Sequence, residues 1–322
     1  MRTCIAGALF SLFFSYAAFA QLSQKQQMAR DNGVALYQQS DWYDSRPLLK
    51  IAAEAGDRAA QYYLGEAIRK SKRYTTVEAK KWYEAAAAQG DLYAMLRLSN
   101  KDDLCSDMGT CVGKTGEEWR ELALTTARER AEKGDTQAMT VLYTARQGVK
   151  WLEKAADLGD SYAQNLLANF YKDGGGWFLI PGNRDKTTEK WLSASAEGGY
   201  PLGMFNYSSF LYEHNGNLSD IRHWIKLAAE GGHIDSVSTY ARNLAHYPDR
   251  LGYAKDLVKG YGLTYLLSKL EGGGTAPENG QRTLPKIAEM MTKDEIQQGL
   301  NFAKLWEETH PTLSYFDPIY GY

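Results

Sequence analysis

A phrase of about seventeen residues recurs six times along the chain, and each copy is centred on a glycine. Two clear copies read WYEAAAAQGDLYAMLRL, from Trp82, and WLEKAADLGDSYAQNLL, from Trp151. Alanine stands three positions before each central glycine, and a small residue stands four positions after it. Because the glycines are 25 to 44 residues apart, the unit is constant and its connections vary in length. The central glycines are Gly56, Gly90, Gly134, Gly159, Gly199 and Gly232.

The phrase has the pattern of two helices joined by a tight turn. Apolar and small residues recur at helical spacing on both sides of the glycine. Glycine takes the left-handed conformation that ends a helix, and aspartate caps the start of the next one. A link this short forces the two helices to run antiparallel, and small residues beside it let the backbones approach closely. The aspartates that follow the glycine are Asp57, Asp91, Asp135 and Asp160.

A large side chain marks the outer end of most copies. Eight positions before the glycine, four copies carry tryptophan, at Trp82, Trp151, Trp191 and Trp224. We interpret these residues as part of the packed core, since aromatic side chains bury large areas. The remaining two copies have Leu48 and Thr126 in this place, and copies five and six replace the aspartate by Tyr200 and His233.

The phrase W-x-x-x-A-A-x-x-G-D-x-x-A-x-x-x-L resembles the Sel-1-like repeat (SLR), a relative of the tetratricopeptide repeat. The resemblance covers roughly residues 48–241. It implies an all-α protein, a right-handed α-solenoid superhelix of stacked antiparallel hairpins that presents curved surfaces to protein partners. We expect a signal peptide at 1–20, a capping helix at 21–47, six degenerate repeats at 48–245, and a C-terminal helical cap with an aromatic tail at 246–322.

The first residues, MRTCIAGALFSLFFSYAAFAQ, predict export. Arg2 precedes a short apolar run, and Ala18-Phe19-Ala20 gives the small-x-small pattern of a cleavage site. The alternative, a membrane anchor, is disfavoured because the run is short for a span. We therefore expect a periplasmic protein without membrane insertion after cleavage. The net charge of −2, without a basic patch, gives no indication of nucleic-acid binding.

Two cysteines follow the signal segment. Cys105 and Cys111 lie in CSDMGTC, and an even number of cysteines in an exported chain favours a disulfide. Such a bridge would stabilise a local turn. A zinc site is the alternative, but two ligands are too few and no histidine lies nearby.

Known catalytic and cofactor motifs are not found. GTCVGKTG, at 109–116, contains GKT, but Met108 stands where a phosphate-binding loop needs glycine. His223 and His233 flank one hairpin turn and could form a metal pair. We favour a surface position for His223, beside Trp224, and a capping role for His233 in place of aspartate. We therefore predict no catalytic residues, no metal and no cofactor.

The connection between copies four and five, YKDGGGWFLIPGN at 171–183, is strongly apolar for a loop. Either it folds back over the core, or Trp177 and Phe178 anchor a partner. Together with Tyr171 and Tyr212, these two are our candidate partner-binding residues. The tail SYFDPIYGY either packs back onto the stack or contacts a partner.

The C-terminal part predicts further helices. Residues 250–270 read as one helix or a broken pair, and EGGGTAPENGQR, at 271–282, reads as a loop. Thr292 and Glu295 form a capping box that begins a helix running to about His310.

These features favour a protein that binds another protein. Within the resembling family, several exported bacterial members are immunity proteins against type VI secretion phospholipase toxins, so the resemblance implies a secreted toxin, encoded nearby, as partner. A second hypothesis is a regulator or assembly scaffold in envelope or polysaccharide secretion. A third is a hydrolase acting on wall or antibiotic substrates, disfavoured because no activated nucleophile is evident.

Overall fold

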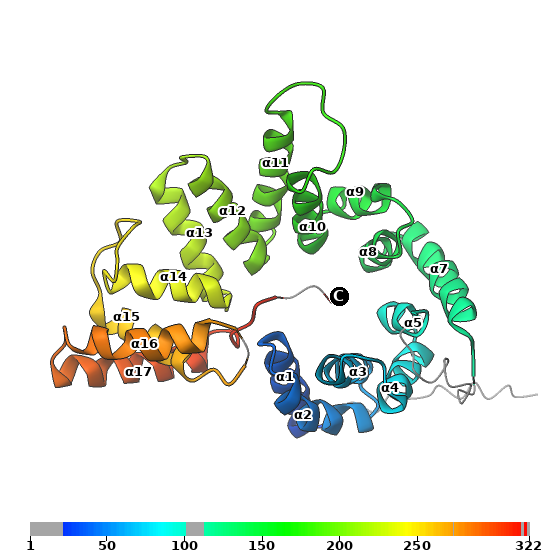
Figure 1. The fold of residues 1–322 in the computed structure, drawn as a ribbon, viewed down its shortest axis with the longest axis horizontal. Helices are drawn as coiled ribbons and strands as arrows, with labels where there is room; N and C mark the ends of the chain where they lie inside the picture. The colour runs from blue at the N-terminus through cyan, green and yellow to red at the C-terminus, as the bar shows by residue number, and fades with distance from the viewer. Residues whose placement is uncertain (1–21, 101–112, 273, 317–318, 321–322) are drawn as a thin grey trace, which may run out of the picture.

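The computed structural model describes residues 22–100, 113–272, 274–316 and 319–320. In this part of the chain the regular structure is helical, and an isolated β-bridge joins His233 and Ser314. Sequential helices pack against each other in a curved array, and the segment that follows α17 extends to the inside of the curve (Figure 1). The helices are α1 (Gln24–Gln38), α2 (Trp42–Glu54), α3 (Arg58–Lys72), α4 (Val77–Ala88), α5 (Leu92–Leu98), α7 (Gly116–Glu132), α8 (Thr136–Thr144), α9 (Val149–Asp157), α10 (Ser161–Lys172), α11 (Asn183–Glu197), α12 (Pro201–Glu213), α13 (Leu218–Glu230), α14 (Ile234–Leu244), α15 (Leu257–Ser268), α16 (Ala276–Ala288) and α17 (Lys293–Thr309).

Each of the six central glycines joins two helices, as predicted. Their φ angles lie between 82° and 90°, in the left-handed region where a side chain would be strained. All four aspartates that follow them accept a hydrogen bond from the amide three residues on, as helix caps do. The hairpins are α2–α3, α4–α5, α7–α8, α9–α10, α11–α12 and α13–α14. The prediction of an all-α solenoid is therefore confirmed.

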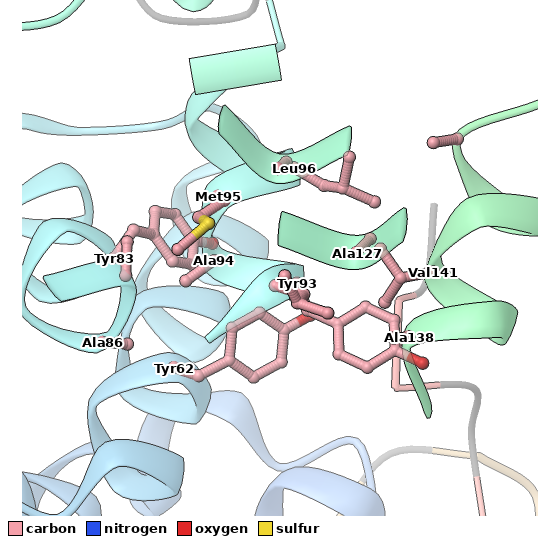
Figure 2. Close-up of a cluster of buried hydrophobic side chains, with 14 of the residues drawn as sticks. Tyr62, Tyr83, Ala86, Tyr93, Ala94, Met95, Leu96, Ala127, Ala138 and Val141 are labelled. Atoms are coloured by element: carbon pink, nitrogen blue, oxygen red, sulfur yellow. The ribbon is translucent and has the colours of Figure 1, made fainter. Parts of the chain in front are cut away.

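The hairpins pack around apolar clusters that each span several helices. One apolar cluster extends from α1 to α12 and is rich in alanine and tyrosine, and a second extends from α13 to α17. The small residues at the turns are fully or nearly fully buried, as Ala53, Ala60 and Ala163 show. Figure 2 shows part of the first cluster, where Tyr62 and Tyr93 lie side by side and Ala138 and Val141 of α8 face them.

One prediction for the C-terminal part is wrong in part. Of residues 271–282, read as a loop, residues 276–282 form the first turns of α16. Pro277 lies in the first turn of that helix, where the missing amide costs nothing. A β-carbon on Gly280 would lie 2.7 Å from the Ser268 amide nitrogen, so this glycine permits close packing of α15 and α16. The capping box of Thr292 and Glu295 at the start of α17 is confirmed.

The two ends of the array meet. The Gln39 side chain, just after α1, donates a hydrogen bond to the Leu313 carbonyl at 2.9 Å. The Tyr315 amide donates to the Gln38 carbonyl at 3.3 Å. The segment after α17 therefore passes the N-terminal helix as it enters the curve of the array (Figure 1).

Some sequence predictions fall outside the described residues. They are the signal peptide at 1–20 and the disulfide between Cys105 and Cys111. None of the helices within the described ranges has the length and apolar character needed to cross a bilayer.

Candidate partner-binding surfaces

The connection between α10 and α11 exposes a cluster of large apolar side chains and projects from the array (Figure 1). Trp177 is 83% exposed, Leu179 76% and Ile180 62%. Phe178 is only half-buried. Exposed apolar groups gathered in one short segment are typical of interaction sites.

Contacts at its base hold this connection in place. The Arg184 guanidinium donates to the carbonyls of Tyr171 and Gly175 and lies 4.8 Å from the centre of the Phe178 ring. Phe178 also packs edge-on against Tyr171, with ring centroids 5.6 Å apart. The two alternatives for this segment thus apply to different residues. Phe178 folds back onto the helices, whereas Trp177 points away from them.

Tyr212 lies near the end of α12 and is 54% exposed. An ion pair of 3.3 Å between Lys172 and Glu213 joins the C-terminal ends of α10 and α12. Tyr171 and Tyr212, each adjacent in sequence to one member of this pair, therefore share one edge of the array. We call the surface formed by Tyr171, Trp177, Phe178 and Tyr212 the rim surface.

A hollow of about 320 Å³ adjoins the rim surface between α12, α13 and α14. Its wall is mainly apolar, and the side chains of Arg242 and Arg250 also contribute to it. Because Tyr212 and Glu213 line the hollow, it is continuous with the rim surface. The apolar lining includes Phe205, Ile221, Ile225 and Leu251.

A second surface, which we did not predict from the sequence, lies on the inner side of the curve. It is formed by aromatic residues that lie at or just after the start of the second helix of a hairpin. Residues 313–316 and 319–320 of the tail occupy this surface. We call it the tail groove. An aromatic side chain recurs within six positions after most of the central glycines, and this pattern could have indicated the surface from the sequence. The groove residues are Tyr62, Tyr93, Tyr162, Tyr200 and His233.

Main-chain hydrogen bonds hold the tail at the entrance of the groove. Ser314 forms a parallel bridge with the start of α14, in which its amide donates to the Gly232 carbonyl and its carbonyl accepts from the Ile234 amide. Further along, the Tyr200 hydroxyl donates to the Phe316 carbonyl at 3.2 Å. The Tyr62 hydroxyl donates to the Ile319 carbonyl at 2.7 Å.

Two aromatic side chains of the tail pack into the groove. Phe316 lies perpendicular to Tyr200, with centroids 6.0 Å apart. Tyr320 stacks on Tyr93, with centroids 6.2 Å apart, and the Arg97 guanidinium lies 3.9 Å from the centre of the Tyr320 ring. Of the two alternatives for the tail, the structure shows that it packs back onto the stack.

Arg97 belongs to a buried charged cluster beneath the groove. Its Nη2 lies 3.0 Å from Oε2 of Glu66, a carboxylate that also binds Arg69 at 3.0 Å and the Tyr83 hydroxyl at 2.7 Å. Burial alone would raise the pKa of Glu66, but the Arg97 and Arg69 charges hold that pKa below its usual value. The cluster fixes Arg97 beneath the Tyr320 ring.

His233 caps α14, as predicted. Its Nδ1 accepts from the Ser236 amide at 3.3 Å, and its ring lies 6.2 Å from that of Phe316. Burial lowers the pKa of His233 to about 4, so the ring is neutral at neutral pH. His223 is exposed and packs edge-on against Trp224. In the described residues, the one cluster of three potential metal ligands is elsewhere and is made of carboxylates, Asp41, Asp44 and Glu271.

No family profile matches this chain, and a search of curated proteins also finds no match. Solved structures that are similar include a protective antigen of uropathogenic Escherichia coli with an SLR fold, at 19% identity over 89% of this chain and 62% of its own, with a TM-score of 0.49. The chain thus spans less than two thirds of that antigen. A Sel1 repeat protein from Oxalobacter formigenes aligns at 20% identity over 78% of this chain and 100% of its own, with a TM-score of 0.40.

A third similar structure is an immunity protein from Pseudomonas aeruginosa. It aligns at 16% identity over 84% of each chain, with a TM-score of 0.39. Because these identities and TM-scores are low, the α-solenoid assignment rests on the hairpins of this chain itself. Of these three structures, two are described as having an SLR fold or Sel1 repeats and one as an immunity protein.

Proposed function

We propose that this protein is an exported binding scaffold that acts as a periplasmic immunity protein and sterically neutralises a type VI secretion phospholipase toxin. The observation that carries partner binding is the exposed Trp177, held away from the helices by a braced connection. Export is supported by the signal-peptide pattern at the N-terminus. The similarity to an immunity protein agrees with the proposal without carrying it.

The mechanism requires shape and anchors. Aromatic anchors that fill pockets supply most of the binding energy of an interface, and the surrounding contacts exclude water. On the rim surface, Trp177 is available to enter a pocket of the toxin, and the hollow beside Tyr212 can accept an apolar side chain in return. A standard interface of about 800 Å² on each partner would be wide enough to cover an active-site mouth.

Binding between the purified protein and the product of an adjacent toxin gene tests the proposal. We expect wild-type protein to bind that toxin and abolish its phospholipase activity. Trp177→Ala should weaken binding about 30-fold or more, as a hot-spot residue does. Tyr43 is 70% exposed on α2, away from the rim surface, and Tyr43→Ala should leave affinity unchanged.

Three outcomes would point elsewhere. If the protein neither binds nor inhibits a neighbouring toxin, the immunity function is excluded, and binding to an envelope or polysaccharide-export component would indicate an assembly scaffold. Turnover of a wall or antibiotic substrate by the purified protein alone would indicate a hydrolase. Equal affinity of wild-type and Trp177→Ala protein would remove the rim surface from the interface.

A further inference from the structure

We propose that the tail groove is a receptor for an extended segment of a partner protein that carries two aromatic residues four positions apart, and that the C-terminal tail occupies it as an internal substitute. The bound tail shows which ligand the groove accepts, namely an extended main chain with two aromatic side chains. This inference deepens the proposed function and rests on it only for the identity of the partner.

The groove recognises the tail through its main chain. Tyr62 and Tyr200 donate their hydroxyls to tail carbonyls, and Ile234 pairs with Ser314 as a strand would. These contacts do not depend on the tail side chains at those positions. Proteins that add an extended peptide by main-chain hydrogen bonds gain affinity in this way and take specificity from side-chain pockets.

Two ring-binding sites supply the specificity. In the first, Phe316 packs against Tyr200 and His233, and in the second, Tyr320 packs against Tyr93 and the Arg97 guanidinium. The second site combines ring stacking with a cation–π contact, and both contacts favour an aromatic occupant. The spacing of the two sites accepts aromatic residues at positions i and i+4.

The tail leaves one polar group of the groove without a partner. The Tyr93 side chain is 2% exposed, and its hydroxyl has no hydrogen-bond partner within the described part of the chain. A buried hydroxyl without a partner is destabilising. A partner segment that places a carbonyl or a polar side chain there would therefore bind more favourably than the tail does.

Attachment gives the tail a large advantage over any free segment. Only three residues separate the end of α17 from Leu313, the first tail residue in the groove. A short link of this kind corresponds to a local concentration in the millimolar range. The groove is therefore covered in the isolated protein, and a partner must displace the tail to enter it.

Fluorescence anisotropy with a labelled synthetic peptide of residues 311–322 tests the proposal in the full chain. The peptide should bind weakly to wild-type protein. In the variant Phe316→Ser/Tyr320→Ser, whose own tail lacks both rings, we expect a Kd at least tenfold lower. Adding Tyr62→Phe to that variant removes the hydroxyl that bonds the Ile319 carbonyl, and it should raise the Kd about three- to tenfold.

Two controls make the result decisive. A peptide of the same composition with its aromatic residues adjacent should bind at least tenfold more weakly, and circular dichroism must show wild-type helix content. If the double variant loses helix content, Phe316→Leu/Tyr320→Leu, which keeps apolar bulk, takes its place. A folded variant that does not bind the peptide would overturn the proposal and leave the tail as a structural strap. Because no toxin is used, this failure is distinct from failure of the immunity function.

Discussion

Residues 173–182 and 311–320 both carry several large apolar side chains, and the described residues of the two segments are placed in opposite ways. Both are short segments outside the hairpins; the first contains four glycines and one proline, and the second contains two prolines. Trp177 in the first is 83% exposed, whereas Leu313 in the second is 8% exposed. Apolar content therefore does not decide whether such a segment is buried.

The surface available to each segment explains the difference. The first segment begins and ends at neighbouring helices, where the Phe178 ring packs against Tyr171 and the Arg184 guanidinium while Trp177 stays exposed. The second crosses the starts of several helices that the curvature brings together, and each start supplies a ring or a polar group. A solenoid thus buries a segment on its inner side and leaves a similar one exposed at its rim.

The largest expected difference between the two regions is in the free energy of unfolding that is lost when an ion pair is removed. Glu66→Gln leaves the buried Arg97 and Arg69 without a carboxylate beneath the groove, so the free energy of unfolding should fall by roughly 3–5 kcal/mol. Glu213→Gln removes a pair whose side chains are 48% and 54% exposed, and it should cost less than about 1 kcal/mol. Urea denaturation of both variants measures the two values.

Equal losses in those two variants would contradict the contrast. They would mean that the Glu66 cluster is as well hydrated as the pair at the rim, and that Arg97 is not fixed beneath Tyr320. Circular dichroism in the absence of urea should show wild-type helix content for Glu213→Gln.

The same substitution at a leucine in each segment gives a smaller, matched contrast. Leu313→Ala removes a buried side chain and should lower the free energy of unfolding by about 2–4 kcal/mol. Leu179 is 76% exposed, so Leu179→Ala should change the free energy by less than about 0.5 kcal/mol. A Leu313→Ala protein as stable as wild type would show that the tail contributes little to the folded state in solution.

Local rules were sufficient to predict the hairpins. Glycine followed by aspartate specifies a left-handed residue and then a helix cap, and both interactions involve residues at most three positions apart. The same local reasoning misread 276–282, because Pro277 and Gly280 serve as a helix start and a packing contact there. Whether a glycine or proline ends a helix depends on the neighbouring helix, which the local sequence does not specify.

The tail groove depends on contacts between residues far apart in sequence. The Tyr62 hydroxyl meets a carbonyl 257 positions later, and Gln39 meets one 274 positions later. These contacts follow from the curvature of the whole array, which accumulates from small rotations between hairpins of unequal spacing. The repeat phrase specifies the hairpin but not the curvature. The sequence therefore could not decide whether the tail packs back onto the stack or contacts a partner.

The smallest of the expected contrasts is a pH effect confined to the groove. Burial lowers the pKa of His233 to about 4 in the folded protein, against 6.5 ordinarily. Below pH 6.5 the unfolded chain therefore binds a proton that the folded chain does not, and stability falls with decreasing pH until about pH 4. Between pH 7 and pH 5 this amounts to about 2 kcal/mol.

The variant His233→Asn isolates this effect, since asparagine also caps helices but does not titrate. Wild-type protein should lose about 2 kcal/mol more than His233→Asn between pH 7 and pH 5 in urea denaturation. The Ser314 amide donates to the Gly232 carbonyl beside His233, and its hydrogen exchange can be measured relative to that of the Arg184 amide. In the same pH range, we expect this relative exchange rate to be higher in wild-type protein than in His233→Asn. Identical pH dependence of the two proteins would mean that water reaches His233 and that the tail does not seal this end of the groove.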